Sequence, residues 1–179
     1  MCAGCYRDLQ SFDVRLENDF TVNCVSEYDG WIRDRIIEYK NGAAHLARPL
    51  AQLLSPLVSP TAVLVAIPTS PAKIRSRRFD TVGLLCAELA KLGNKREVLA
   101  ALRLVRGVQD QVGLSEKQRS RNLSHAFAGT QSLVQNVVVV DDVITTGATL
   151  REAKRALVIA GAPHVSAVVL CGSTKKRYG

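Results

Sequence analysis

Two adjacent carboxylates, Asp141 and Asp142, directly follow a run of four valines at residues 137–140. The valines predict a buried parallel strand, because β-branched side chains pack well on a sheet that is covered on both faces. Neighbouring acids repel each other and are costly in a dry core, so we expect them at the strand end, facing hydroxyl donors, a metal ion or solvent. The acid pair therefore indicates a functional site.

The residues after the acids are suited to binding an anion. They supply hydroxyl groups, a glycine that tolerates positive φ and successive backbone N–H groups at the start of a predicted helix. The partial positive charge of a helix N-terminus favours a phosphate there. A ribose 5-phosphate would place its phosphate in this loop and its diol against the acids. The loop consists of Val143, Ile144, Thr145, Thr146, Gly147, Ala148 and Thr149.

This stretch resembles the phosphoribosyl pyrophosphate (PRPP) motif of type I phosphoribosyltransferases, which is an apolar strand, two acids, two spacers and Thr-Thr-Gly-Ala-Thr. The resemblance implies that Asp141 and Asp142 are the catalytic acids, hold the ribose hydroxyls and help to place Mg²⁺, while residues 143–149 bind the 5-phosphate. The alternative is a buried strand, an Asp-rich turn and a capped helix without a ligand. No Gly-Lys-Ser/Thr phosphate loop and no Gly-x-Gly-x-x-Gly after a strand is present, so nucleoside triphosphate and dinucleotide sites are not expected.

A second polar segment follows the apolar residues 62–67, which predict another buried strand. In the resembled family the loop after the equivalent strand receives the pyrophosphate. Cations are dense here, which suits a leaving group with several negative charges. The alternatives are a solvated basic loop or a nucleic-acid contact. The implied pyrophosphate ligands are Thr69, Ser70, Lys73, Arg75 and Arg77.

Residues 103–114 are polar, contain glycine and predict a mobile flap. Type I enzymes use such a loop to close over PRPP and exclude water. The resemblance implies contacts from Arg103, Arg106 and Gln111 in this flexible loop.

Strands and helices alternate along the chain and predict one α/β domain with a mostly parallel central sheet flanked by helices. Strands are expected at 20–25, 62–67, 97–104, 137–140 and 164–171, and helices at 31–40, 43–54, 79–92 and 149–160. Ligands of such sheets bind at the carboxyl ends of the strands. We place this domain at residues 20–179, after an N-terminal segment at 1–19. A homodimer is left open.

The N-terminal segment contains Cys2-x-x-Cys5, half of the ligand set of a zinc ribbon. Cys24 is a candidate third ligand, although it lies in an alternating segment that predicts a strand. The alternative is two inert thiols. An odd cysteine number, five, predicts reduced thiols, and with no targeting segment and no run of eighteen apolar residues we expect a cytoplasmic protein without a membrane span.

Secondary features resemble the ComF-type branch of the family, which is known for a protein of DNA uptake. They include Tyr28-Asp29-Gly30 with Lys40, Pro68 with Arg77 and Phe79, and Ala126-Phe127. Arg78 departs from the branch, which has glycine there, and the Cys pair is single rather than double. Lys40 and His45 are otherwise interpreted as surface residues.

The sequence leaves two functions open. One is a Mg²⁺-dependent phosphoribosyltransferase whose acceptor is unidentified, since no segment is recognisable as a base-reading hood. The other is a non-catalytic PRPP sensor or DNA-handling component of the competence machinery that binds single-stranded DNA. The net charge of +8 fits either polyanion, whereas the low aromatic content of 5% supplies no obvious base-stacking surface.

Overall fold

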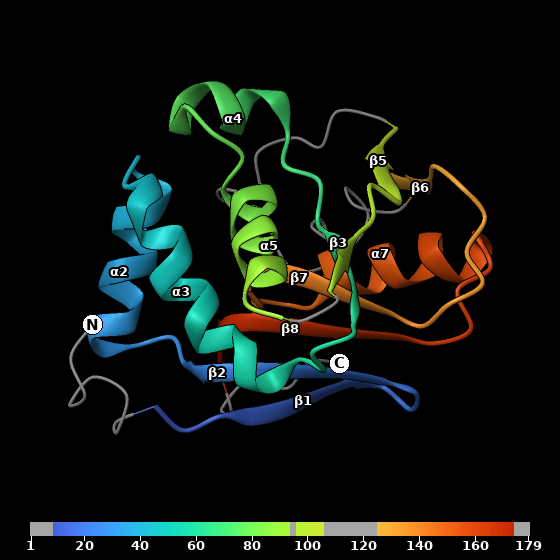
Figure 1. Ribbon diagram of the computed structural model, residues 1–179, viewed down its shortest axis with the longest axis horizontal. Coiled ribbons are helices and arrows are strands. Elements are labelled where there is room, and N and C mark those ends of the chain that lie inside the picture. The colour runs from blue at the N-terminus through green and yellow to red at the C-terminus, as the bar shows by residue number, and fades with distance from the viewer. Residues whose placement is uncertain (1–8, 94–95, 106–124, 174–179) are drawn as a thin grey trace.

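A six-stranded sheet forms the centre of the protein (Figure 1). The computed structural model describes residues 9–93, 96–105 and 125–173. The first two strands are antiparallel and all other neighbours in this sheet are parallel, which confirms the predicted fold class. In spatial order the strands are β1 (Phe12–Glu17), β2 (Phe20–Glu27), β8 (Val165–Gly172), β7 (Val137–Val143), β3 (Val63–Ala66) and β4 (Glu97–Val98).

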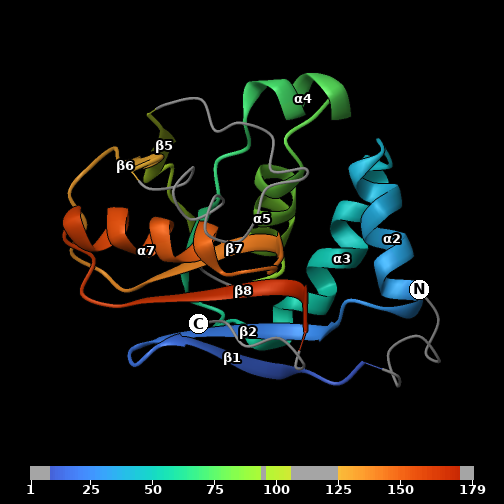
Figure 2. The same cartoon turned by 180° about the vertical axis from the view of Figure 1, so that it is seen from behind.

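Helices cover both faces of the sheet (Figures 1 and 2). One face packs against α2 (Gly30–Lys40), α3 (Ala47–Leu54) and α5 (Thr81–Lys91). The other packs against α7 (Ala148–Ile159) and a two-stranded sheet of β5 (Leu102–Leu104) and β6 (Phe127–Gly129).

The central strand β7 contributes to both hydrophobic cores. Val139 is fully buried on the side of α7, and Val140 is fully buried on the side of α3 and α5. Successive side chains of a strand point to opposite faces, so a strand between two helical layers is apolar at every position. This is why the four valines show no alternation.

The parallel strands bring four chain segments to one edge of the sheet. The register pairs Ala66 of β3 with Val140 of β7, and Asp141 of β7 with Val169 of β8. Tyr28, directly after β2, donates its backbone N–H to the carbonyl of Gly172 at the end of β8, at 2.9 Å. The carboxyl ends of β2, β8, β7 and β3 therefore lie side by side.

Two predicted elements differ from the structure. The strand predicted at 97–104 is divided between β4 and β5, which belong to different sheets. The helix predicted at 43–54 begins with the 3-10 turn η1 (Ala44–Leu46) before α3, and a second turn, η2 (Ser55–Leu57), follows it.

The predicted boundary at residue 19 lies in the turn between β1 and β2. β1 is paired with β2 along its length, with Val14 opposite Val22, so residues 12–17 are an edge of the same sheet. Lys154 of α7 holds this turn by ion pairs to Glu17, at 2.9 Å, and to Asp19. In the ranges described, no helix is both long and apolar enough to cross a lipid bilayer.

The predicted basic loop after β3 is a helix, α4 (Pro71–Arg77). Proline suits the first helical position, and the Ser70 hydroxyl caps the helix by accepting the Lys73 backbone N–H at 3.4 Å. No residue of α4 is buried, and the helix stands away from the sheet (Figure 1). Local capping rather than core packing therefore defines it.

Arg78, which follows α4, has a φ of +68°. A helix commonly ends with a residue in this left-handed conformation, and glycine is preferred there because it has no Cβ. The substitution that sets this chain apart from the ComF-type pattern thus places an arginine in a conformation that is strained for side chains.

We predict that Arg78→Gly raises the free energy of unfolding by about 1 kcal/mol, because the left-handed strain is removed. The matched control is Arg75→Gly, which removes the same charge from within α4 and lowers stability by about 1 kcal/mol. Chemical denaturation of both variants measures the two effects. A loss of stability in Arg78→Gly would contradict this account.

Candidate ligand-binding site

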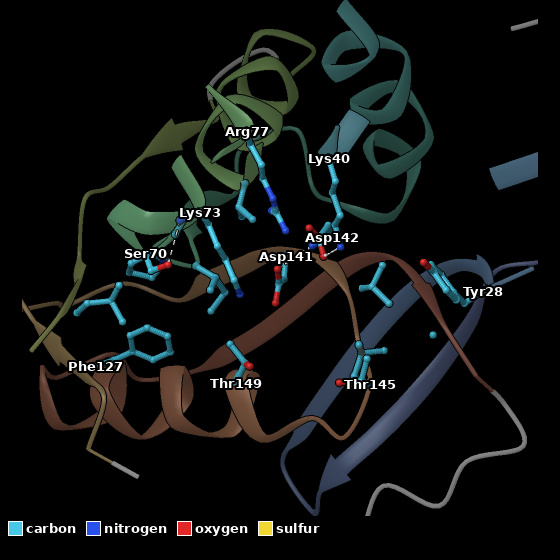
Figure 3. Close-up of a pocket in the computed structure, with 18 of the residues that line it drawn as sticks. Tyr28, Lys40, Ser70, Lys73, Arg77, Phe127, Asp141, Asp142, Thr145 and Thr149 are labelled. Carbon is cyan, nitrogen blue, oxygen red and sulfur yellow. Dashed lines mark hydrogen bonds and ion pairs between the residues drawn. The ribbon is translucent and has the colours of Figure 1, made fainter. Parts of the chain in front are cut away.

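A cavity of about 490 Å³ lies at the carboxyl edge of the sheet (Figure 3). Its walls come from the ends of β2, β3, β7 and β8, from α2, α4 and α7, and from the β5–β6 pair. The polar and charged side chains that line it are Tyr28, Lys40, Thr69, Ser70, Lys73, Arg77, Asp141, Asp142, Thr145, Thr149 and Ser173.

The two carboxylates at the end of β7 have different environments. Asp142 is buried, and its Oδ1 lies 2.8 Å from the ammonium of Lys40. Asp141 is half-buried, and its Oδ1 accepts the backbone N–H of Asp142 at 2.8 Å. Burial, and next the negative charge of Asp142, raise the pKa of Asp141 to about 7, against the opposing effect of Lys40 and Lys73.

The loop between β7 and α7 forms one wall of the cavity. Thr145 and Thr149 line it, whereas Thr146 is buried and its hydroxyl accepts the backbone N–H of Ala148 at 3.4 Å. Within the described ranges, the backbone N–H groups of Thr145, Thr146 and Gly147 have no hydrogen-bond acceptor. The start of α7 thus retains free donors for an anion.

Gly147 is favoured by both its conformation and its surroundings. Its φ is +78°, and a Cβ there would lie 2.6 Å from a methyl carbon of Leu16 in β1. Any other residue at this position would be strained by the positive φ and would push the Leu16 side chain aside, so the turn into α7 favours glycine.

The opposite wall is formed by the β3–α4 connection and α4 itself. Lys73 and Arg77 point from α4 towards the acid pair (Figure 3). The Thr69 hydroxyl donates to Asp80 Oδ1 at 2.6 Å, so its proton is used within the protein. Asp80 also caps α5 by accepting the backbone N–H of Gly83 at 3.0 Å, which ties the connection to that helix.

Several residues assigned from the sequence do not line the cavity. Thr146, Gly147 and Ala148 shape the loop from behind, and Arg75 is exposed on α4. Arg103 is exposed in β5, opposite Ala128 of β6, and is therefore part of a paired strand rather than of the predicted flap.

Four other assigned residues lie outside the described ranges, namely Arg106, Gln111, Cys2 and Cys5. Cys24, the candidate third zinc ligand, is fully buried in the sheet. Burial raises its pKa to about 12, as expected for a thiol that packs as a small apolar residue.

The sequence reasoning missed three contributors to the site. Lys40 is half-buried at the acid pair and is not the surface residue that helix periodicity indicated. Tyr28 lines the cavity although its turn motif gave no sign of this, and Asp80 orients Thr69. The one available signal was the ComF-type opening segment, which contains both Tyr28 and Lys40.

Residues 26–178 match the family described as "Phosphoribosyl transferase domain", and the chain therefore belongs to this family. Relatives place it in the ComF-type branch. The "DNA utilization protein YhgH" of Escherichia coli O6:H1 is 34% identical over 110 residues, which cover 60% of this chain and 48% of that protein. The "Competence protein F" of Haemophilus influenzae is 25% identical over 193 residues, covering 88% of this chain and 83% of that protein.

The matched region of this chain spans about half the length of the YhgH relative. Among solved structures, one described as the allosteric regulatory enzyme of purine biosynthesis is similar with a TM-score of 0.45 and 23% identity. That similarity covers 73% of this chain and 25% of the other.

The raised pKa of Asp141 predicts a pH-dependent cost in stability. In the unfolded state the Asp141 carboxyl ionises near its ordinary pKa of 3.8, but in the folded state it ionises only near 7. Between these two pH values the folded protein holds a proton that the unfolded chain has released. The free energy of unfolding therefore falls as pH rises from 3.8 to 7. Asp141→Asn should therefore be more stable than the wild type at pH 8 and differ less near pH 4. The full shift corresponds to about 4 kcal/mol, and screening by solvent at this half-buried site reduces the expected difference to about 2 kcal/mol.

Denaturation midpoints across this pH range test the prediction. Asp34→Asn, at an exposed position on α2, is the matched control and should follow the wild-type pH profile. If Asp141→Asn also followed that profile, the carboxyl would ionise equally in the folded and unfolded states.

Proposed function

We propose that this protein binds PRPP together with Mg²⁺ and transfers the phosphoribosyl group to an acceptor nucleophile, releasing pyrophosphate. One observation carries the proposal: the acid pair and Thr145, whose backbone N–H has no acceptor within the described residues, line the same cavity as Lys73 and Arg77 on its opposite wall. A diol, a monophosphate and a pyrophosphate can each find a complementary partner in this one cavity.

Each part of PRPP has a proposed partner. The ribose hydroxyls donate to Asp141 and Asp142, and the 5-phosphate accepts from the backbone N–H groups and hydroxyls of residues 144–149. The pyrophosphate lies against Ser70, Lys73 and Arg77. Ser70 is the better hydroxyl donor of its pair, because Thr69 gives its proton to Asp80.

Mg²⁺ fits the donor set of this site, since it is a hard cation that prefers carboxylate oxygen and substrate phosphate. Asp141 is the more available ligand, directly or through water, because Asp142 is already paired with Lys40. When bound, the ion would supply charge neutralisation for the departing pyrophosphate.

The chain itself contributes position and charge. Lys73 and Arg77 stabilise the negative charge that grows on the leaving group, which is the electrostatic contribution that is usually largest in such reactions. The anchored 5-phosphate and ribose hydroxyls fix the sugar, so that the acceptor meets its reactive carbon in one orientation.

Calorimetric titration with PRPP and Mg²⁺ tests this proposal. Wild-type protein should release or absorb heat on binding, and the double variant Asp141→Asn, Asp142→Asn should bind about a hundredfold more weakly, because it loses two charged acceptors. The control double variant Asp13→Asn, Asp34→Asn removes two exposed carboxylates and should bind as the wild type does. No heat from the wild type at millimolar PRPP would refute the proposal.

A second candidate function is a non-catalytic component that senses PRPP or handles single-stranded DNA. It is favoured by two exposed cations that do not line the cavity, Arg75 of α4 and Arg78 directly after that helix. The net charge of +8 and the names of the YhgH and competence relatives agree with it. On this proposal α4 separates two anion sites, one facing the cavity and one facing solvent.

Fluorescence anisotropy with a labelled single strand tests the outward site. Arg75→Ala, Arg78→Ala should weaken binding and reduce the slope of log affinity against log salt by about 1.4, since two phosphate contacts are lost and each contributes about 0.7 on a single strand. The control Arg15→Ala, Arg48→Ala removes two exposed arginines elsewhere. Salt-independent binding, or equal slopes for both double variants, would count against this function.

A further inference from the structure

Lys40 is the cation that contacts the acid pair directly. It is the last residue of α2, and its Nζ lies 2.8 Å from Asp142 Oδ1 although the residues are 102 positions apart. The Lys40 side chain is 25% exposed and that of Asp142 is 11% exposed. The ion pair is therefore partly withdrawn from water and lines the cavity (Figure 3).

The neighbouring Tyr39 fixes the position of Lys40. Tyr39 is fully buried, its hydroxyl donates to the Thr81 carbonyl at 2.6 Å, and its ring packs against Phe79. The Thr81 hydroxyl in turn accepts from Arg77 at 3.0 Å. Packing thus fixes the end of α2, which carries Lys40. Thr81, which holds Tyr39, also holds Arg77 of the opposite wall.

The pairing makes the two acids unequal. The Asp142 carboxylate forms an ion pair with Lys40. Within the described residues, the Asp141 carboxylate instead accepts a backbone N–H, that of Asp142. When both carboxylates are ionised, they and the ammonium of Lys40 together carry a single negative charge. A divalent cation that approached both carboxylates would also meet the ammonium of Lys40 and be repelled by it.

We propose that Lys40 is a positioning residue that takes the place of a metal ion on Asp142. The acid pair then does not capture a divalent cation by itself, and Asp142 stays oriented as an acceptor. The ion enters with a pyrophosphate-bearing ligand, whose oxygens supply the missing negative charge; this last step rests on the proposed function. Lys40 thereby makes uptake of the metal depend on uptake of the ligand.

Mn²⁺ binding to the full chain, measured by electron paramagnetic resonance without any sugar phosphate, tests Lys40 by itself. Lys40→Gln retains a hydrogen-bond donor for Asp142 but removes the charge. This variant should bind Mn²⁺ roughly tenfold more tightly than the wild type, because the repulsion is lost. Lys40→Arg keeps the charge and should bind as weakly as the wild type.

Two further variants test whether the gain in Mn²⁺ affinity depends on Asp142 and on the position of the lysine. Lys40→Gln, Asp142→Asn should return to wild-type weakness, since the carboxylate that gained the metal is gone. Lys91→Gln is the matched control, because it also breaks a lysine–acid pair, to Glu88, away from the cavity, and should leave Mn²⁺ affinity unchanged. Thermal unfolding of each variant confirms that it folds, and Lys40→Met serves as a second uncharged variant.

Tight Mn²⁺ binding by the wild type, or equal affinities in the wild type and Lys40→Gln, would overturn the inference. A purely structural role for Lys40 would shift melting temperatures without raising Mn²⁺ affinity, which also overturns it. PRPP titration of the wild type is a separate measurement. Its failure would refute the proposed function and leave the Mn²⁺ comparison intact.

Discussion

Two adjacent carboxylates at the end of a strand that is buried on both faces must be compensated by other parts of the chain. Asp142 cannot reach bulk water as a surface acid does, since it is only 8% exposed, and Asp141 beside it is half-buried. Lys40 and the backbone N–H of Asp142 supply the compensation from within the protein. The remaining negative charge is available for a ligand, and the cations of α4 face it across the cavity.

The hydrophobic cores determine where these charges meet. One core packs α2, α3 and α5 against the sheet and brings Lys40 to the end of β7. The other packs α7 and the β5–β6 pair against the opposite face and sets the direction of the loop before α7. The site lies where the edges of both cores meet, so that its geometry depends on packing far from the polar residues themselves.

α4 follows a different principle from the other helices. It buries no side chain, and its ends are held by the Ser70 cap and by the contacts of Asp80 and Arg77 with neighbouring polar groups. A helix without a core face can project cations in two directions, which explains why Lys73 and Arg77 face the cavity while Arg75 does not. The strained Arg78 at its end indicates that stability was not the only requirement on this segment.

The sequence by itself determined the parallel sheet, the two apolar strands and the acid–threonine–glycine loop after one of them. These are local patterns, in which residue type and short spacing predict the backbone, and the carboxyl-edge rule then predicts that both polar segments meet. It also predicted most of the lining on both walls, including Thr145, Thr149, Lys73 and Arg77. The helix of α4 was missed because it lacks the apolar face from which helices are usually recognised.

Only the tertiary structure decided which charges pair. The partner of Asp142 comes from 102 residues away, and on its own helix Lys40 looks like any exposed cation. Likewise, Asp80 restrains Thr69 and Leu16 restricts Gly147 only because separate elements pack together. Such contacts depend on the packing of whole layers, and one-dimensional spacing contains no signal for them.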